Sequence, residues 1–315
     1  MNTKPTADRR IIAVVGPTAS GKTALAVELA EIYNGEVISC DSVQVYKGLD
    51  IGSAKVTAEE MRGIPHHMID VADPTESFSC ADYAEMAKKA IDDIQNRGKT
   101  VIFCGGTGLY LDSVIGISGF SDAGRDEAFR AEMEKKSPVE LHSRLREIDP
   151  ASAEAIHPNN VKRVIRALEI FRVTGKTKTE WDEESKRVSP PYETVIIGLD
   201  MRDRQALYDR IDRRVEIMME NGLVDEVRRL DSPAFRASTA SDGIGYKELL
   251  RCFDGRCTLD EAVEDIKQAS RNYAKRQLTW FRRNKSVHWI FTDELSGEDK
   301  FKLIVNSSIS IINNS

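Results

Sequence analysis

Residues 11–33 read IIAVVGPTASGKTALAVELAEIY, and the rest of the chain is best understood from this stretch. The apolar run 11–15 predicts a buried strand, and Leu25, Leu29 and Ile32 share one face of a helix predicted over 22–33. Between them, residues 16–23 match G-x-x-x-x-G-K-[ST] at every fixed position. Strand, loop and helix in this order are the context that the motif requires. They predict an α/β protein with the core of the P-loop-containing nucleoside triphosphate hydrolases.

The loop is predicted to hold a di- or triphosphate. Its glycines allow backbone N–H groups to point at phosphate oxygens, and the following helix presents its positive end. Lys22 adds a cation, and the Thr23 hydroxyl is placed to bind Mg²⁺, whose other ligands are usually phosphate oxygens and water. Mg²⁺ is therefore the expected cofactor. The expected phosphate-binding residues are Gly16, Pro17, Thr18, Ala19, Ser20, Gly21, Lys22 and Thr23.

The remaining pattern predicts two domains. Apolar runs alternate with helical periodicity in the first 115 residues, which is typical of a parallel sheet covered by helices. From about 120 to 187 the strand signal disappears and the periodicity is helical. Residues 1–118 and 190–315 are predicted to form the catalytic core, and residues 119–189 an all-helical insertion domain. Further strands are expected at 36–40, 100–104, 194–199 and 287–291, and further helices at 80–97, 160–174, 204–221 and 259–283.

Composition excludes several classes of protein. With 41% hydrophobic and 30% charged residues, the chain can bury a core and is not disordered. It has no run of roughly 18 apolar residues and no signal-peptide pattern, so we expect a cytoplasmic protein without a membrane span. Five scattered cysteines fit a reducing compartment, and the adjacent pair His66-His67 faces two ways on an extended segment, so neither predicts a metal site.

Net charge gives a divided signal about nucleic acid. The formal charge of −6 argues against a phosphate-rich partner, because proteins that bind nucleic acid are usually basic. Residues 271–287 nevertheless carry six basic residues and no acidic one, with Tyr273, Trp280 and Phe281 among them. Basic and aromatic side chains together suit phosphate binding and base stacking, although the two adjacent aromatics are equally suited to a helix core.

Two polar loops follow the second and third predicted strands. Asp41 follows the second predicted strand, where a carboxylate can hold a metal ion, act as a general base or simply cap a turn. The third strand continues into Gly105-Gly106-Thr107-Gly108, where glycines permit close backbone approach and Thr107 offers a hydroxyl. Because the carboxyl ends of parallel strands meet at one edge of a sheet, both loops are expected beside the phosphate loop.

Taken together, these residues resemble the family of tRNA dimethylallyltransferases, also called tRNA isopentenyltransferases. The resemblance rests on GPTASGKT at 16–23, DSVQVYKG at 41–48 and GGTGLY at 105–110, with further matches at 162–169, 243–248 and 274–282. It implies transfer of a dimethylallyl group from dimethylallyl diphosphate to the exocyclic amine of the adenosine 3′-adjacent to the anticodon, in tRNAs that read codons beginning with U. The chain has no D-D-x-x-D motif of the isoprenoid synthases, so the phosphate loop must hold the diphosphate.

The resemblance also implies roles for single residues. Lys22 and Mg²⁺ on Thr23 stabilise the leaving diphosphate, Thr107 hydrogen-bonds the donor near its departing oxygen, and Asp41 accepts the proton of the adenine amine. The anticodon stem-loop is the implied partner, bound by the insertion and by neighbouring loops. The implied tRNA contacts are Asp41, Ser42, Val43, Gln44, Arg130, Lys162, Arg163, Val164, Ile165, Arg166, Asp242, Gly243, Ile244, Gly245, Tyr246 and Lys247.

Other interpretations stay open on the residues alone. The basic residues of 162–166 are equally compatible with a solvated helix face. The phosphate loop also fits a small-molecule kinase that uses ATP, or a non-catalytic nucleotide switch, and both predict tight binding of a nucleoside triphosphate. Prenylation of free adenine nucleotides is a related alternative, against which the basic insertion favours tRNA. We expect the bacterial form, because the final 25 residues lack the cysteines and histidines of the zinc finger that some eukaryotic members carry. We also expect a monomer.

Overall fold

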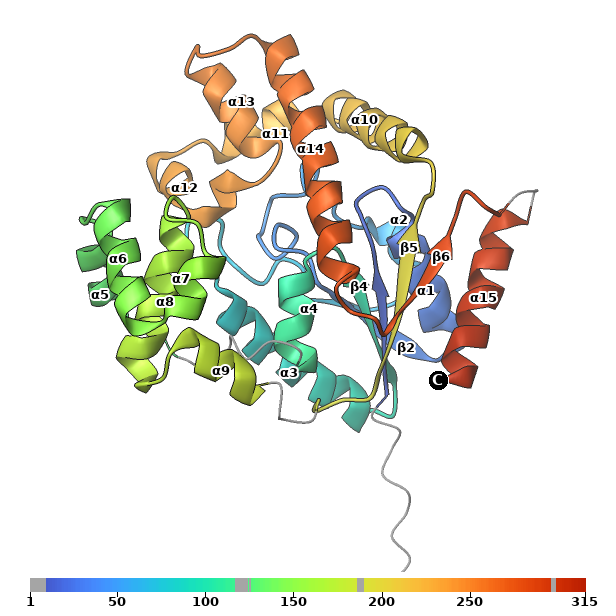
Figure 1. Ribbon diagram of the computed structural model, residues 1–315. Coiled ribbons are helices and arrows are strands. Elements are labelled where there is room, and N and C mark those ends of the chain that lie inside the picture. The colour runs from blue at the N-terminus through green and yellow to red at the C-terminus, as the bar shows by residue number, and fades with distance from the viewer. Residues whose placement is uncertain (1–9, 117–123, 125, 186–189, 296–298) are drawn as a thin grey trace, which may run out of the picture. The chain divides into compact units, whose positions relative to one another are not determined.

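The chain forms two compact units in a computed structural model that describes residues 10–116, 124, 126–185, 190–295 and 299–315 (Figure 1). One unit comprises Met1–Leu111 and Tyr192–Ser315, and the other comprises Asp112–Pro191. The expected domain boundary at residues 118 and 119 lies outside the described residues, as does residue 189. The first unit is an α/β structure and the described part of the second contains helices without strands, so the predicted fold class is confirmed.

The first unit is built on a parallel sheet of six strands in the order β3-β2-β4-β1-β5-β6. The strand β1 lies between β4 and β5, and its Ile12 stands opposite Ile102 on one side and Val195 on the other. All five residues of β1 are buried, as expected for a parallel strand covered on both faces. The strands are β1 (Ile11–Val15), β2 (Gly35–Ser39), β3 (His66–His67), β4 (Thr100–Gly105), β5 (Thr194–Asp200) and β6 (Val287–Phe291).

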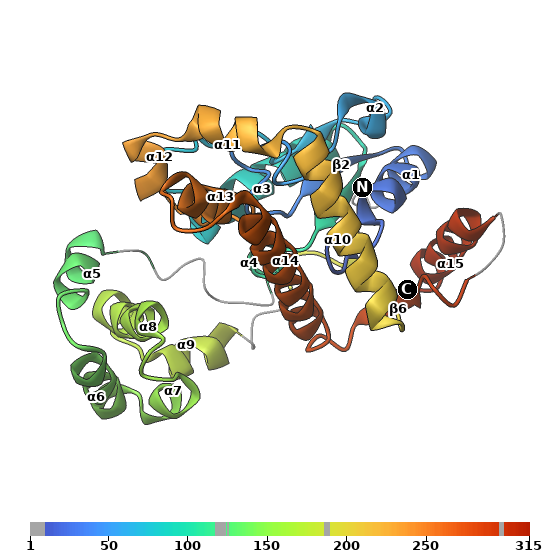
Figure 2. The same cartoon turned by 90° about the horizontal axis from the view of Figure 1, so that it is seen from above.

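Helices pack on this sheet through apolar faces. Leu25 and Leu29 of α1 share a core cluster with Ile304 and Val305 of α15 and with Val14 of β1. Figure 2 shows α10 and α14 side by side, and a second cluster that includes Leu207 and Leu278 joins them. The helices are α1 (Lys22–Ile32), α2 (Ala58–Met61), α3 (Cys80–Asn96), α4 (Gly108–Ile115), α10 (Arg204–Glu220), α11 (Leu223–Leu230), α12 (Pro233–Ala237), η2 (Thr239–Asp242), α13 (Tyr246–Phe253), α14 (Leu259–Phe281) and α15 (Lys300–Asn314).

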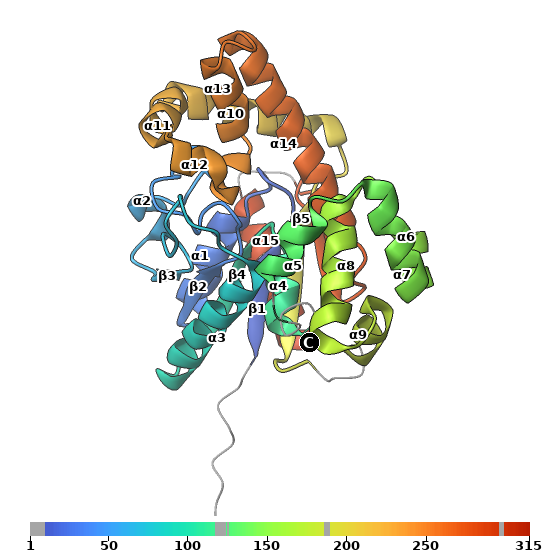
Figure 3. The ribbon, with the colours of Figure 1, turned by 90° about the vertical axis from the view of Figure 1, so that its left-hand side faces the viewer.

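The second unit is a cluster of short helices with a core of its own (Figure 3). Its buried side chains include Met133, Leu141, Leu145 and Leu168. The helix α8 ends at Gly175, whose φ of 72° is the left-handed conformation that glycine adopts freely. The helices are α5 (Glu127–Met133), α6 (Pro138–Ile148), α7 (Pro150–Ala155), α8 (Val161–Thr174) and α9 (Lys178–Ser185). Within the described ranges, neither unit holds a helix with the length and apolar character that crossing a bilayer requires.

Candidate active site

The phosphate loop leaves the carboxyl end of β1 along a path that needs its glycines. Gly16 has a φ of 143° and Gly21 a φ of 94°, which side-chain-bearing residues rarely adopt. A Cβ on Gly16 would lie 2.3 Å from the carbonyl oxygen of Leu199 on β5. The hydroxyl of Ser20 is buried and has no hydrogen-bond partner among the described residues. A buried hydroxyl without a partner inside such a loop fits a bound polar ligand.

Lys22 is held inside the loop that it serves. Its Nζ donates a hydrogen bond of 2.6 Å to the carbonyl oxygen of Pro17. Burial lowers the pKa of Lys22 to about 8, and Arg214 on α10 acts in the same direction, while the charge of Asp41 opposes it. The negative charge of a bound phosphate stabilises the protonated form of Lys22, so the site favours an anionic ligand.

Thr23 lies in the first turn of α1 and is an exposed residue. Cys104 lies one residue before the end of β4, and burial raises the pKa of its thiol to about 11. Among the described residues, no group of three or more His, Cys, Asp or Glu side chains is arranged to hold a metal ion. Mg²⁺ that arrives with a diphosphate needs few protein ligands, because phosphate oxygens and water fill its shell. Thr23 and the unpartnered Ser20 hydroxyl fit that mode of binding.

Asp41 and Thr107 lie in two loops that hydrogen bonds join. The N–H of Ser42 donates to Thr107 Oγ1 at 3.1 Å, and the N–H of Thr107 donates to the carbonyl oxygen of Cys40 at 3.0 Å. Asp41 caps a turn, because its Oδ1 accepts the N–H groups of Val43 (2.9 Å) and Gln44 (3.3 Å). Both of these bonds use Oδ1, so the turn is compatible with proton transfer to Oδ2. The expected meeting of the two loops is therefore observed.

Gln277 on α14 is part of the site, although the match at 274–282 gave this residue no role of its own. The side chain is buried, its Oε1 accepts the N–H of Thr18 at 2.9 Å, and its Nε2 donates to the carbonyl oxygen of Gly106 at 3.1 Å. A Cβ on Gly106 would lie 1.9 Å from Gln277 Nε2, and one on Gly108 would lie 2.1 Å from Trp280 Cδ1. The glycines after β4 are thus required by the approach of α14, and Trp280 packs on the fold at this point.

A pocket of about 250 Å³ opens where these loops meet. Arg214 from α10, which the sequence had not indicated, faces it together with the predicted site residues. Tyr273 also lines the pocket: its hydroxyl lies 3.4 Å from Thr107 Oγ1, and burial raises its pKa to about 12. Of the predicted residues, the pocket brings together Thr18, Asp41, Ser42, Val43, Asp242, Gly243, Ile244 and Lys247. A groove of about 540 Å³, lined by Ala19, Gly21, Asp209, Arg210, Arg213, Arg214 and Ile217, also borders the phosphate loop.

Two of the predicted tRNA contacts in the second unit are engaged in a buried ion cluster. Arg130 donates two hydrogen bonds of 2.7 Å to the carboxylate of Glu169, and Arg166 donates one of 2.5 Å. Glu169 is fully buried, which alone would raise its pKa, but these guanidinium groups lower the pKa to about 2. Arg130 and Arg166 therefore stabilise the buried Glu169, and the cluster of two guanidinium groups and one carboxylate keeps one positive charge. Their predicted contact with tRNA stays a prediction.

The other predicted contacts differ in burial. Val164 and Ile165 are buried and belong to the core cluster of the second unit, which also contains Met133 of α5. Their side chains pack in this core, whereas the neighbouring Lys162 and Arg163 are exposed. In the first unit Gly245 and Tyr246 are buried, and the Tyr246 hydroxyl donates to Glu226.

The basic segment 271–287 is partly neutralised by acidic residues from other elements. Arg271 bonds both carboxylate oxygens of Asp212 at 2.6 Å, and Arg282 donates to the buried Asp200 at 2.7 Å. Four basic side chains of this segment are exposed and form no ion pair with the described residues: Lys275, Arg276, Arg283 and Lys285. Arg282 is exposed as well, although it is paired, so this surface keeps four unpaired cations.

The chain is similar in sequence and structure to enzymes of one family. The family model for IPP transferase matches residues 44–284. The tRNA dimethylallyltransferase of Anoxybacillus flavithermus is 51% identical over 298 residues, which cover 94% of this chain and 95% of that protein. The crystal structure of a full-length tRNA isopentenylpyrophosphate transferase from Bacillus halodurans has a TM-score of 0.73 and 46% identity and covers 98% of both chains. A eukaryotic dimethylallyltransferase acting on tRNA has a TM-score of 0.78 and 30% identity over 90% of this chain and 73% of that one.

Proposed function

The chain belongs to the IPP transferase family and is a prenyltransferase that acts on tRNA, and we propose that the pocket beside its phosphate loop is the transfer site. The donor is dimethylallyl diphosphate. The acceptor is the exocyclic amine of the adenosine 3′-adjacent to the anticodon in tRNAs that read UNN codons, and the product is N6-isopentenyladenosine. One observation carries the proposal: Gln277 and Thr107 join the phosphate loop to the Asp41 loop around one pocket.

The phosphate loop holds the diphosphate of the donor. An allylic C–O bond ionises readily because the developing cation is delocalised, so the main requirement is to stabilise the leaving diphosphate. The loop N–H groups and the ammonium of Lys22 supply this stabilisation, and Arg214 adds a second cation at the pocket. Thr23 would hold Mg²⁺ together with oxygens of the diphosphate, and the ion would supply further positive charge when bound. The diphosphate departs with the electron pair of the broken C–O bond.

Asp41 receives the proton of the acceptor amine. The adenine amine is a weak nucleophile that becomes acidic only as its new N–C bond forms, so a carboxylate is a sufficient base. Thr107 hydrogen-bonds the donor near its departing oxygen. The adenosine leaves its stack to reach the pocket, as in other enzymes that modify bases. Exposed cations grip the anticodon stem-loop, among them Lys162 and Arg163 in the second unit and Lys247 in the first.

The ATP-dependent kinase is not favoured. The relatives are named tRNA dimethylallyltransferase and tRNA isopentenylpyrophosphate transferase, and both names describe transfer of a prenyl group. Every residue invoked lies on one chain, so the proposal needs only a monomer. It also places the enzyme in the cytoplasm, where tRNA resides.

Mass spectrometry of RNA tests the proposal directly. An unmodified anticodon stem-loop with adenosine 3′ of the anticodon is incubated with the protein, Mg²⁺ and dimethylallyl diphosphate. We expect the RNA to gain the mass of one five-carbon prenyl unit. A matched stem-loop with guanosine at that position, which lacks the N6 amine, should gain none. Unchanged mass in several candidate tRNAs, alongside turnover of ATP, would refute the proposal.

A further inference from the structure

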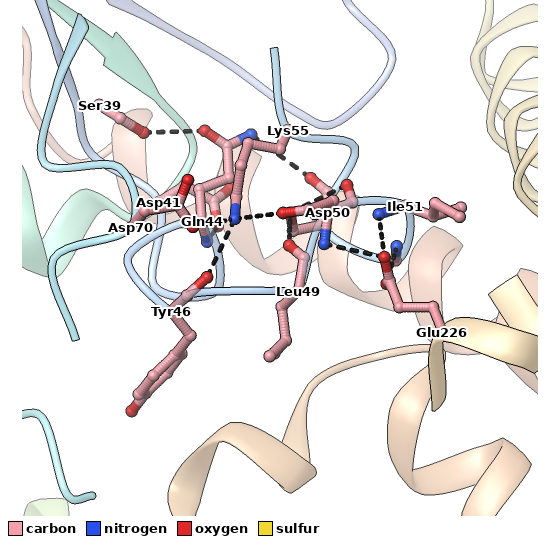
Figure 4. Close-up of polar contacts among 12 residues, drawn as sticks. Ser39, Asp41, Gln44, Tyr46, Leu49, Asp50, Ile51, Lys55, Asp70 and Glu226 are labelled. Atoms are coloured by element: carbon pink, nitrogen blue, oxygen red, sulfur yellow. Dashed lines mark hydrogen bonds and ion pairs between the residues drawn. The ribbon is translucent and has the colours of Figure 1, made fainter. Parts of the chain in front are cut away.

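The carboxylate of Glu226, on α11, is enclosed by hydrogen-bond donors (Figure 4). Glu226 is 2% exposed. Its Oε2 accepts the N–H groups of Asp50 (3.0 Å) and Ile51 (2.7 Å), and its Oε1 accepts the N–H of Gly52 (3.0 Å) and the hydroxyl of Tyr246 (2.7 Å). All four donors are neutral, and three are consecutive backbone groups. A buried carboxylate is costly to desolvate, so this arrangement holds one loop conformation strongly.

The loop that Glu226 holds is linked to Asp41 by further hydrogen bonds. Gln44 Nε2 donates to the carbonyl oxygens of Ser53 (3.4 Å) and Ala54 (3.2 Å), which continue the same loop. The backbone N–H of Gln44 donates to Asp41 Oδ1 at 3.3 Å. A continuous series of contacts therefore runs from Glu226 through residues 50–54 and Gln44 to the Asp41 carboxylate, as Figure 4 shows.

Two parts of this series, the loop that Glu226 holds and Asp41, lie at the same pocket. Gly52 and Ser53 line it from one side, and Asp41 lines it from the other end of the loop. A Cβ on Gly52 would lie 2.7 Å from the ring of Tyr246, so the tyrosine ring and the Glu226 carboxylate hold Gly52 between them. Residues 50–54 form no helix or strand, so their position depends on side-chain contacts of this kind.

We propose that Glu226 is a positioning residue for Asp41, acting through loop 50–54 and Gln44. The inference rests on the proposed function. A general base must lie within about 2.6–3.2 Å of the proton that it accepts, and a misplacement of about 1 Å can lower the rate about 10²-fold. If Glu226 only anchored α11, its loss would lower the stability of the fold and leave the rate of the folded enzyme unchanged.

The first test separates the rate from diphosphate binding. Glu226→Gln keeps the side-chain shape but replaces one acceptor oxygen with an NH₂ group, which is a donor. In either orientation of the amide, this NH₂ group faces N–H or O–H groups that are themselves donors. We expect kcat for dimethylallyl transfer to fall about 10- to 10²-fold, with the Kd of inorganic pyrophosphate unchanged within about twofold. Glu248→Gln is the matched control, because Glu248 is a buried glutamate on α13 that accepts the N–H of Gly245 at 2.8 Å. Its kcat should stay within about threefold of the wild type.

The second test asks whether Glu226 acts through Asp41. In an Asp41→Asn background, adding Glu226→Gln should lower the single-turnover rate no further than about twofold, because the group to be positioned is already lost. A full multiplicative loss in the double variant, or a pyrophosphate Kd that rises with the loss of rate, overturns the inference. If Glu226→Gln does not fold, Tyr246→Phe removes one donor and keeps the ring on Gly52; it should show a several-fold loss of kcat and the same dependence on Asp41. Wild-type protein that transfers no prenyl group refutes the proposed function itself, whereas normal transfer by Glu226→Gln overturns only the role of Glu226.

Discussion

The half-buried ammonium of Lys22 predicts that diphosphate binding weakens as the pH rises above neutrality. In the free protein, burial lowers the pKa of Lys22 to about 8. A bound diphosphate places negative charge beside the same ammonium and raises its pKa again. The bound form therefore keeps Lys22 protonated over a range of pH in which the free form loses the proton, and binding must take that proton up.

The size of the effect follows from this pKa. With a pKa of about 8, about 90% of free Lys22 is protonated at pH 7 and about 10% at pH 9. If bound Lys22 stays charged throughout, the Kd of a diphosphate is about tenfold higher at pH 9 than at pH 7 on account of this residue. At pH 8 the free residue is half protonated, so binding takes up about half a proton.

Isothermal titration calorimetry with inorganic pyrophosphate in metal-free buffer measures both quantities. Titrations in buffers with different ionisation enthalpies give the proton uptake, and titrations at pH 7, 8 and 9 give the Kd. Lys22→Met is the matched control, because the titration of pyrophosphate itself affects both proteins equally. The ratio of the two Kd values should change about tenfold between pH 7 and pH 9. A constant ratio, or equal proton uptake by both proteins at pH 8, would refute the reasoning.

Three further predictions concern the general base Asp41, tRNA binding by α8 and the ion cluster of the second unit. Asp41→Asn should lower the single-turnover transfer rate about 10²-fold or more, since general-base catalysis contributes roughly 10² to 10⁴; a large loss of tRNA affinity in filter binding with normal turnover would contradict this role. Replacing Lys162 and Arg163 by alanine should weaken tRNA binding and make the negative slope of log K against log salt shallower by about 1 to 2. An unchanged slope would mean that this face of α8 is only solvated. Glu169→Gln should lower the free energy of unfolding in urea by about 3–5 kcal/mol, because it leaves Arg130 and Arg166 beside an uncharged group; the exposed Glu140→Gln should change it by less than about 0.5 kcal/mol, and equal effects would show that the ion cluster adds no stability.

Elements whose signals are local could be predicted from the sequence. The strand at 11–15, the loop glycines and α1 follow from periodicity and from one motif within twenty-three residues. Ser79 and Asp82 form a capping box at the start of α3, in agreement with the helix predicted over 80–97, and β6 occupies Val287–Phe291 as expected. The insertion is helical because its apolar residues recur at helical spacing without strand alternation.

Features that depend on distant contacts could not be predicted in this way. The strand β3 has two residues, which is too short for any periodic signal, and α15 mixes Ser and Asn with its buried Ile304 and Ile312. Arg130 and Lys162 carry the same charge in the sequence. Only the structure shows that Arg130 is paired with the buried Glu169, whereas Lys162 is exposed. Local periodicity carries no information about a buried acceptor that lies elsewhere in the chain.

The hydrogen bond between Thr18 and Gln277 joins residues that are 259 positions apart, and this separation has a consequence for synthesis on the ribosome. The phosphate loop is translated first, but its partner on α14 emerges only when most of the chain has been made. The central strand β1 must likewise wait for β5, which follows the whole helical insertion. Until then, an apolar strand edge is exposed on the nascent chain and is open to wrong pairing or to chaperones. The second unit has its own local core and can fold during this interval, so we expect the helical insertion to become protease-resistant on stalled nascent chains before the core that surrounds it in sequence.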